Sequence, residues 1–390
     1  MRIVHTSDWH VGRRWKGIQR LDEMEAILDH LAGFIERESI DLVLHSGDVF
    51  DSRNPSGESE RLVNEFLVRV GRTGARTVVI AGNHDDPQRF DARALLATGA
   101  NVHILGRPRS ADHGGTFMLE ARGGETAVVA ALPFASPGMW VSALDLAGDE
   151  ASARTRYAHL FQRAVGNLCA AYRDDAVNLL MAHTHLEGAA FGESERRVHL
   201  SEDWAATPQT LPATATYIAL GHIHKPQKVA GTLPAWYAGS PLQLDFGEVG
   251  QEKTFAVVEA TPRRPARVEH VPYEGGRPLR DVEGTLDELE DRASADHAGA
   301  NGDDSWLRVT VKLAGKDPDI NRKVRELLPN ALVVRVDLPE SEVPDSDLPD
   351  AGAPAAELYA AYHRRAHERE PEPAVLDTFQ HLHERAREDA

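Results

Sequence analysis

The sequence is poor in cysteine and has no long apolar run. Cys169 is the single cysteine among 390 residues, so no internal disulfide can form, which fits a reducing compartment. No apolar stretch approaches the roughly 20 residues of a membrane-spanning helix, and the longest ones, such as residues 128–133, are strand-sized. A polar motif begins within the first ten residues, which leaves no room for a signal peptide. We therefore expect a cytoplasmic protein that has no membrane association.

Positive charge is also scarce. The chain has 43 basic and 61 acidic residues, and its formal net charge is −18. Taken alone, this balance argues against nucleic-acid binding, because such binding relies on Lys and Arg to neutralise phosphates. Net charge describes the whole surface, however, and a local basic path together with bound divalent cations would suffice. The acidic runs gather at residues 281–291 and 340–350, outside the part that carries the motifs described next.

Strand and helix patterns alternate over the first 90 residues. Short apolar runs predict strands at 3–5, 41–45 and 77–81, and apolar residues at helical spacing predict helices at 24–35 and 62–70. This β-α-β-α-β order predicts parallel strands with right-handed crossovers, and hence an α/β fold. The further expected elements are strands at 126–133, 177–182, 216–220 and 235–237, a helix at 153–171, and edge or linker strands at 253–270.

A domain boundary is expected near the glycine-rich turn at residues 273–277. The predicted organisation is a main domain at 1–272, an α+β unit at 273–338, a linker at 339–355 and a helical tail at 356–390. Pro371 and Pro373 divide the tail into two helices. Because short helices need a surface to bury against, an amphipathic pair after a linker is typical of a docking element.

Five short polar clusters each fall just past a predicted strand. They are Asp8-Trp9-His10, Gly47-Asp48, Gly82-Asn83-His84-Asp85, His183 within Ala182-His183-Thr184-His185, and Gly221-His222-Ile223-His224. Ligands of an open α/β sheet gather at the carboxyl ends of its strands, so five strands can deliver these side chains to one place. Each cluster also has a structural interpretation, such as a helix N-cap for Asp8 or an ordinary turn for Gly47-Asp48. All five in order at strand ends are better explained by one shared site.

These residue types suit divalent metal ions. Aspartate supplies charge and can bridge two ions, histidine supplies a neutral nitrogen that favours Mn, Fe, Zn or Co, and asparagine supplies a carbonyl oxygen. Two ions about 3.5–4 Å apart activate a water and hold the phosphate oxygens of an in-line displacement. The glycines before Asp48, Asn83 and His222 let the chain turn sharply off its strands.

As a set, Asp8-X-His10, Gly47-Asp48, Gly82-Asn83-His84-Asp85 and Gly221-His222-X-His224 resemble the signature of the calcineurin-like metallophosphoesterases. Residues 5–12, 221–227 and 237–248 are further similar to the bacterial SbcD family of nuclease subunits. The resemblance implies a four-layer α-β-β-α metallophosphoesterase sandwich with a small α+β capping domain that faces DNA. It also implies that the C-terminal helical tail docks on an SMC-like ATPase, SbcC.

The same resemblance implies the ligands position by position. The first metal ion takes Asp8, His10, Asp48 and His224, and the second takes Asn83, His183 and His222, with Asp48 as the bridge. Two Mn²⁺ ions are implied, with Mg²⁺ or another divalent cation as alternatives. His84 matches the catalytic histidine, which stabilises the transition state or protonates the leaving oxygen. Asp85 orients either His84 or its loop.

Two positions near these ligands allow more than one interpretation. His185 competes with His183, but the family ligand is usually followed five residues later by glycine, which fits His183 with Gly188. Asp51 stands where archaeal and eukaryotic relatives often carry a second catalytic histidine, and its role is open. Trp9 either packs under the site or stacks on a base, and packing is the favoured interpretation.

The function that the resemblance implies is a metal-dependent DNA nuclease for repair, recombination and replication. It would act as a 3′-to-5′ exonuclease on duplex ends and an endonuclease at hairpins and single strands, as a homodimer within a heterotetramer with SbcC, in the nucleoid-associated cytoplasm. Dimerisation is expected through helices near 58–70 or 86–97. Arg13, Arg14, Lys16 and Arg53 either touch DNA phosphates or are solvated surface charges.

Two other functions remain open. One is a stand-alone nucleotide or small-molecule phosphodiesterase of the same superfamily, which would have no use for a linker and two docking helices. The other is a non-catalytic scaffold with a vestigial site, which would lack a ligand, whereas all seven are present.

Overall fold

The structure, a computed structural model, describes residues 1–135, 150–190, 206–297, 304–315, 317–338, 353–367 and 369–388. Its residue contacts define two compact units. The first consists of residues 1–311 and 318–336, and the second of residues 312–317 and 337–390. The first unit contains two large sheets and most of a small one, and the second contains the helical tail.

The first large sheet has six strands in the order β14-β13-β1-β4-β5-β6. Its strands are β1 Arg2–Thr6, β4 Leu42–His45, β5 Arg76–Ile80, β6 Val102–Leu105, β13 Thr254–Glu259 and β14 Arg267–Pro272. Strands β1, β4, β5 and β6 are parallel, as the β-α-β-α-β pattern predicted. The prediction of edge or linker strands at 253–270 is correct for β14 but wrong for β13. Strand β13 is almost wholly buried and pairs antiparallel with both β1 and β14.

The second large sheet has the order β11-β12-β10-β9-β8-β7. Its strands are β7 Thr116–Glu120, β8 Thr126–Leu132, β9 Val177–His183, β10 Tyr217–Gly221, β11 Gln227–Lys228 and β12 Ala235–Tyr237. The four central strands β8, β9, β10 and β12 are parallel, and the edge strands β7 and β11 run antiparallel to their neighbours. A two-stranded hairpin, β2 Arg14–Trp15 with β3 Ile18–Gln19, follows β1.

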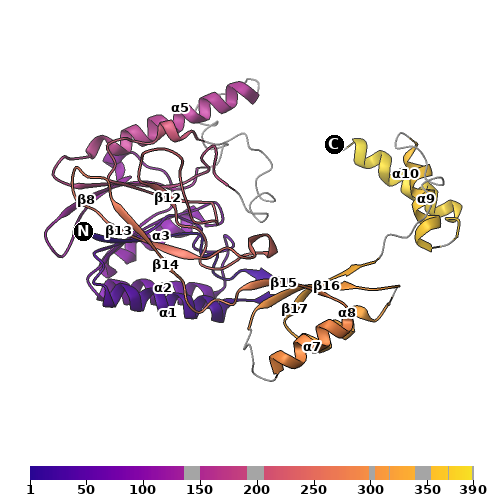
Figure 1. Cartoon of the computed structure of the whole chain (residues 1–390). Helices are drawn as coiled ribbons and strands as arrows, with labels where there is room; N and C mark the ends of the chain where they lie inside the picture. The colour runs from indigo at the N-terminus through magenta and orange to yellow at the C-terminus, as the bar shows by residue number, and fades with distance from the viewer. Residues whose placement is uncertain are drawn as a thin grey trace. The chain divides into compact units, whose positions relative to one another are not determined.

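Helices cover the outer faces of the two sheets, as Figure 1 shows with α1 and α2 on one side and α5 on the other. The helices are α1 Leu21–Arg37, α2 Gly57–Arg72, α3 Pro87–Ala97 and α5 Glu150–Leu168. Successive residues of a strand point to opposite faces of its sheet. Ile3 of β1 therefore joins the apolar core between the sheets, while Val4 joins the core beneath α1 and α2. The four-layer α-β-β-α sandwich is confirmed.

The small sheet has the order β15-β16-β17, with β15 Leu279–Gly284, β16 Trp306–Lys312 and β17 Ala331–Asp337. Helices α7 Leu286–His297 and α8 Ile320–Leu327 alternate with these strands along the chain. The residue contacts place most of this α+β part in the same unit as the two large sheets. Trp306 of β16 contacts a buried ion pair of the main domain, Arg20 with Glu23. Glu23 accepts hydrogen bonds from the Arg20 guanidinium at 2.6 and 2.8 Å and from the Trp306 indole N–H at 3.0 Å.

The second unit is formed mainly by two helices, α9 Ala355–His367 and α10 Pro373–Glu388, separated where Pro371 and Pro373 predicted a break. The rings of Tyr359 and Phe379 stack with their centroids 4.3 Å apart and hold the pair together. Most of the predicted linker, residues 339–352, lies outside the described residues. Among the described helices, none combines the length and the apolarity that crossing a membrane requires.

Candidate metal centre

The register of the parallel strands brings the five clusters to one edge of the paired sheets. Thr6 at the end of β1 lies beside His45 at the end of β4, and Gly221 at the end of β10 lies beside His183 at the end of β9. The loops beyond the strands are then joined by backbone hydrogen bonds. Asp8 N–H donates to the Gly47 carbonyl at 2.9 Å. The convergence predicted from strand ends is therefore present.

Four of the predicted ligands have left-handed backbone conformations. Their φ angles are +52° for Asp8, +47° for His10, +54° for Asp48 and +104° for His222. Such conformations are uncommon for residues with a side chain, cost on the order of 1–3 kcal/mol each, and cluster at functional sites. The surrounding loops hold these residues in place and aim their side chains at a shared centre.

The glycines before the predicted ligands Asp48 and Asn83 are required for two different reasons. Gly47 has φ +103°, which matches the expectation that glycine allows a sharp turn off the strand. Gly82 does not have a positive φ, but a Cβ there would lie 2.1 Å from Asp48 Oδ1. The requirement at Gly82 is therefore the close approach of the Asp48 side chain.

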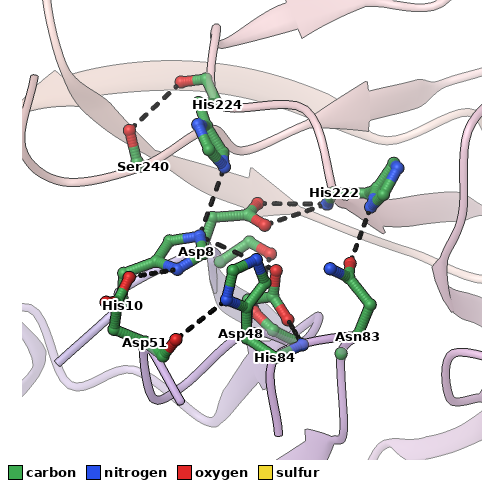
Figure 2. A network of polar contacts seen from close by, with 12 residues as sticks. Asp8, His10, Asp48, Asp51, Asn83, His84, His222, His224 and Ser240 are labelled. Carbon is green, nitrogen blue, oxygen red and sulfur yellow. Dashed lines mark hydrogen bonds and ion pairs between the residues drawn. The ribbon is translucent and has the colours of Figure 1, made fainter. Parts of the chain in front are cut away.

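Asp8, His10 and His224 form the first group of predicted ligands. The Nε2 atoms of His10 and His224 face each other at 3.2 Å. The carboxylate of Asp8 accepts the His222 backbone N–H at 3.0 and 3.2 Å, which fixes its orientation toward the same space. Figure 2 shows these side chains converging from the loops after β1 and β10. Together they offer ligand atoms within 4.8 Å of one another, close enough to bind one cation.

Asn83, His183 and His222 form the second group. Asn83 Oδ1 lies 3.0 Å from both His183 Nε2 and His222 Nδ1. Asp48 stands between the two groups, with Oδ2 3.7 Å from His10 Nε2 and 3.5 Å from His183 Nε2. Its position is that of a bridging ligand. Asp8 also reaches this side of the site, because Asp8, Asp48 and His183 form a further possible ion-binding group.

The protonation preferences of the cluster fit divalent cations. Burial lowers the pKa of His10 to about 4, so its ring is neutral and can offer a nitrogen lone pair. Burial raises the pKa of Asp8 to about 6, although His183 and His224 act in the opposite direction. Burial alone would lower the pKa of His183, but the Asp48 and Asp8 carboxylates raise it to about 9. A buried cluster that stabilises positive charge and presents imidazole, carboxylate and amide donors fits a pair of metal ions.

His84 lies at the rim of the cluster. Its Nδ1 is 2.9 Å from the Asp51 carbonyl oxygen, and its backbone N–H donates to Asp48 Oδ1 at 2.8 Å. Because a carbonyl oxygen only accepts, Nδ1 carries the proton and Nε2 is left for another partner. Asp51 therefore contacts His84 through the Asp51 backbone carbonyl. The Asp51 carboxylate lies 3.4 Å from His10 Nδ1 and 3.3 Å from the Arg13 guanidinium.

Asp85 orients the loops and not the His84 ring. Its buried carboxylate accepts the backbone N–H groups of Val49 at 3.2 Å, Phe50 at 3.0 Å and Gly82 at 2.9 Å. These bonds join the loop after β4 to the loop after β5. Of the two roles expected for Asp85, the geometry supports the second.

The choice of His183 over His185 is supported by a buried hydrogen-bond network. His183 Nδ1 donates to the Ser46 carbonyl at 2.8 Å, which leaves Nε2 facing Asn83 and Asp48. Ser46 Oγ in turn bonds the His5 ring at 2.8 Å, and the other His5 nitrogen bonds the Tyr217 hydroxyl at 2.9 Å. No sequence pattern indicates this support, because Tyr217 is 212 residues from His5.

The predicted DNA contacts differ in their surroundings. Arg14 and Lys16 are exposed on the β2–β3 hairpin, and Arg53 is exposed in the loop after β4. Arg13 is half-buried against Asp51.

Trp9 is buried, packs on the Phe66 ring with centroids 5.0 Å apart, and donates its indole N–H to Thr6 Oγ1 at 2.6 Å. The packing interpretation of Trp9 is confirmed.

Two family models match the chain. One, described as calcineurin-like phosphoesterase, matches residues 1–226, and the other, described as type 5 capsule protein repressor C-terminal domain, matches residues 276–381. The chain therefore belongs to the calcineurin-like phosphoesterases and has their fold.

Comparison with characterised proteins narrows this class. The SbcD subunit of the nuclease SbcCD from Bacillus subtilis (strain 168) is 36% identical over 282 residues, which cover 72% of this chain and 71% of that protein. Its counterpart from Rhodobacter capsulatus is 33% identical, with 74% and 76% covered, and that from Escherichia coli K12 is 29% identical, with 84% and 82% covered. Within the phosphoesterases the chain belongs to the SbcD family, and it is a phosphoester hydrolase of the nuclease kind.

Proposed function

We propose that this chain is a two-metal DNA nuclease that acts with an SbcC-like SMC ATPase in DNA end processing. The observation that carries the proposal is the position of the Asp48 carboxylate, 3.5 Å from His183 and 3.7 Å from His10, between two groups of buried donors. Mono-metal and metal-free hydrolases do not need a carboxylate in such a shared position. Membership of the SbcD family supplies the substrate class.

The proposed cofactor is a pair of Mn²⁺ ions, with Mg²⁺ or another divalent cation as alternatives. The first ion is held by Asp8, His10, Asp48 and His224, and the second by Asp48, Asn83, His183 and His222. Imidazole ligands favour Mn²⁺ over Mg²⁺, since Mg²⁺ prefers oxygen donors. Bound ions of this kind supply Lewis acidity toward the phosphate oxygens and a nucleophile from water at neutral pH.

His84 is proposed to act on the leaving oxygen of the scissile phosphodiester. With its Nδ1 proton directed at the Asp51 carbonyl, the ring presents Nε2 to the substrate side of the cluster. In its protonated form it can transfer a proton from Nε2 to the departing deoxyribose oxygen or stabilise charge on the phosphoryl group. Asp85 contributes by holding the loops that carry Asp48 and His84.

DNA is proposed to approach over the exposed cations Arg14, Lys16 and Arg53, with Arg13 beside the first metal site. Their contacts would fall on phosphates and position the strand without reading sequence. This local path would offset the formal net charge of −18.

The proposed assembly is a homodimer within a heterotetramer, in the nucleoid-associated cytoplasm. The names of the relatives place them in a complex with a second protein, SbcC. The proposed domain roles are a nuclease domain at 1–272, a DNA-facing cap at 273–338, a linker at 339–355 and an ATPase-docking tail at 356–390. The proposed activity is 3′-to-5′ on duplex ends, with endonucleolytic cleavage at hairpins and single strands.

A nuclease assay with competing substrates tests the proposal. With Mn²⁺, the chain is expected to degrade linear duplex DNA faster than it hydrolyses bis-p-nitrophenyl phosphate, and EDTA is expected to abolish both reactions. The assay is run with and without the ATPase and ATP. Preference for the small ester would favour a stand-alone phosphodiesterase, and no turnover of either substrate would favour a vestigial scaffold.

Deletion of residues 356–390 is expected to abolish co-purification with the ATPase. The reason is that α9 and α10 expose apolar side chains, with Tyr362 63% and Leu382 58% accessible, that a partner would cover. Mn²⁺-dependent hydrolysis by the truncated chain alone should persist, because the metal ligands all lie in the first unit. Co-purification of the truncated chain would move the docking site elsewhere.

A further inference from the structure

A buried carboxylate and a buried ammonium stand behind the predicted ligand His224. Glu248 Oε1 lies 3.5 Å from His224 Nδ1, on the opposite side of the ring from the Nε2 that faces His10. Lys253 Nζ lies 2.7 Å from Glu248 Oε2. The side chains of Glu248 and Lys253 are 0% and 7% exposed. Neither residue is among the predicted ligands.

The three residues come from different parts of the fold. His224 follows β10 of the second sheet, whereas Lys253 directly precedes β13 of the first sheet. Since β13 runs antiparallel to β1, its first residue lies at the edge where β1 ends and the metal loops begin. Glu248 closes a short 3-10 helix, Phe246–Glu248, between them. The contacts therefore connect the first sheet to a ligand supplied by the second.

Lys253 contacts the backbone of His224 directly and contacts Glu248, the carboxylate that faces the His224 ring. Its ammonium donates to the His224 carbonyl at 2.9 Å and to Ser240 Oγ at 3.1 Å, while also pairing with Glu248. Glu248 Oε2 additionally accepts the Leu244 backbone N–H at 3.0 Å. These bonds leave the two carboxylate oxygens with different partners, Oε2 with Lys253 and Leu244, and Oε1 with His224.

Stability alone is a poor reason for such an ion pair. Removing two charges from water costs several kcal/mol per ion, and well-packed apolar residues of similar volume are often at least as stabilising. A histidine that binds a metal, in contrast, commonly donates its second ring N–H to a carboxylate. That bond fixes the tautomer and raises the basicity of the ligating nitrogen.

We propose that Glu248, held in place by Lys253, is a positioning residue for His224. It accepts the Nδ1 proton, so that the Nε2 lone pair is directed into the first metal group with Asp8 and His10. Lys253 keeps the carboxylate from rotating away and anchors the His224 backbone. This inference rests on the proposed two-metal function and adds two residues to its machinery.

Mn²⁺ binding to Glu248→Gln tests the inference without relying on catalysis. Equilibrium dialysis with elemental analysis counts ions per chain across a Mn²⁺ titration. Wild-type protein is expected to bind two. The variant is expected to bind the second-group ion normally and the other about 10–100-fold more weakly, because glutamine accepts the proton without the negative charge. Unchanged binding of both ions would overturn the proposal.

Glu23→Gln is the matched control, since Glu23 is also a buried carboxylate paired with a basic side chain, Arg20, but contacts none of the predicted ligands. It is expected to lower the melting temperature and leave both Mn²⁺ affinities unchanged. A purely structural role for Glu248 would make its variant behave in the same way. If Glu248→Gln does not fold, Glu248→Asp, which keeps the charge but shortens the side chain, is expected to weaken the same ion.

The Mn²⁺ counts distinguish a failure of the two-metal function from a failure of the role assigned to Glu248. Fewer than two Mn²⁺ ions on wild-type protein would contradict the proposed two-metal function itself. Two ions on wild-type protein with unaltered affinities in the Glu248 variants would remove only the role assigned to Glu248 and Lys253.

Discussion

Asp48→Asn is expected to remove Mn²⁺-dependent nuclease activity and to weaken both metal ions together. Asp48 Oδ2 lies within 3.7 Å of a histidine from each ligand group, so a single substitution acts on both sites. The substitution is nearly isosteric but removes the buried negative charge. Losing several kcal/mol of transition-state stabilisation corresponds to a fall of about 10³-fold or more in rate.

Initial rates on linear duplex DNA, combined with Mn²⁺ content, measure this effect. Asp41→Asn is the matched control, because Asp41 directly precedes β4 at the end of the strand opposite Asp48 and accepts the Arg2 backbone N–H at 2.9 Å. Its variant is expected to keep both ions and full activity. An Asp48 variant that loses one ion and keeps the other at wild-type affinity would contradict the bridging role.

His84→Gln is expected to lower the maximal rate about 10²–10⁴-fold, the range typical of losing a general acid, while both Mn²⁺ ions and DNA stay bound. The side chain bonds the Asp51 carbonyl, whereas the contact with Asp48 comes from the backbone N–H of residue 84. Replacing the ring therefore leaves the orientation of Asp48 intact. Single-turnover cleavage at saturating enzyme, together with Mn²⁺ counting, separates chemistry from binding.

A different outcome would assign His84 another role. His10, Asp48 and His84 also form a group that could hold an ion. If the His84 variant lost Mn²⁺ in proportion to its activity, His84 would be a ligand and the separation of binding from proton transfer would be wrong. His113→Gln, at an exposed histidine that bonds Ser110 Oγ at 2.8 Å, controls for the general effect of the substitution and is expected to be neutral.

The parts of the fold that follow from local pattern could be predicted from the sequence. The strand ends of β1, β4, β5, β9 and β10 follow from short apolar runs, and parallel pairing then brings their polar continuations to one edge. The place of a strand within its sheet is not local information. The alternating pattern of residues 253–270 predicts an edge or a linker strand. The pattern does not reveal that β1 and β14 flank β13 in the folded sheet.

In the candidate site, too, some features could be predicted from local sequence and others depend on the folded structure. Aspartate, asparagine and histidine at strand ends indicate a metal centre, but nothing in their order indicates left-handed backbones at Asp8 and His10. The residues that hold the ligands escape prediction for a related reason. Lys253 reaches the His224 carbonyl across 29 positions, and such contacts depend on packing that no single segment specifies.

The interior place of β13 has a consequence for biosynthesis. Strand β1 carries the loop of Asp8 and His10, and it pairs with β13, whose first residue is Thr254. Until residue 259 has left the ribosome, β1 has an open side, which is a template for wrong pairing. All of the predicted metal ligands precede β13 in the sequence, so they leave the ribosome before the strand that closes this side of β1.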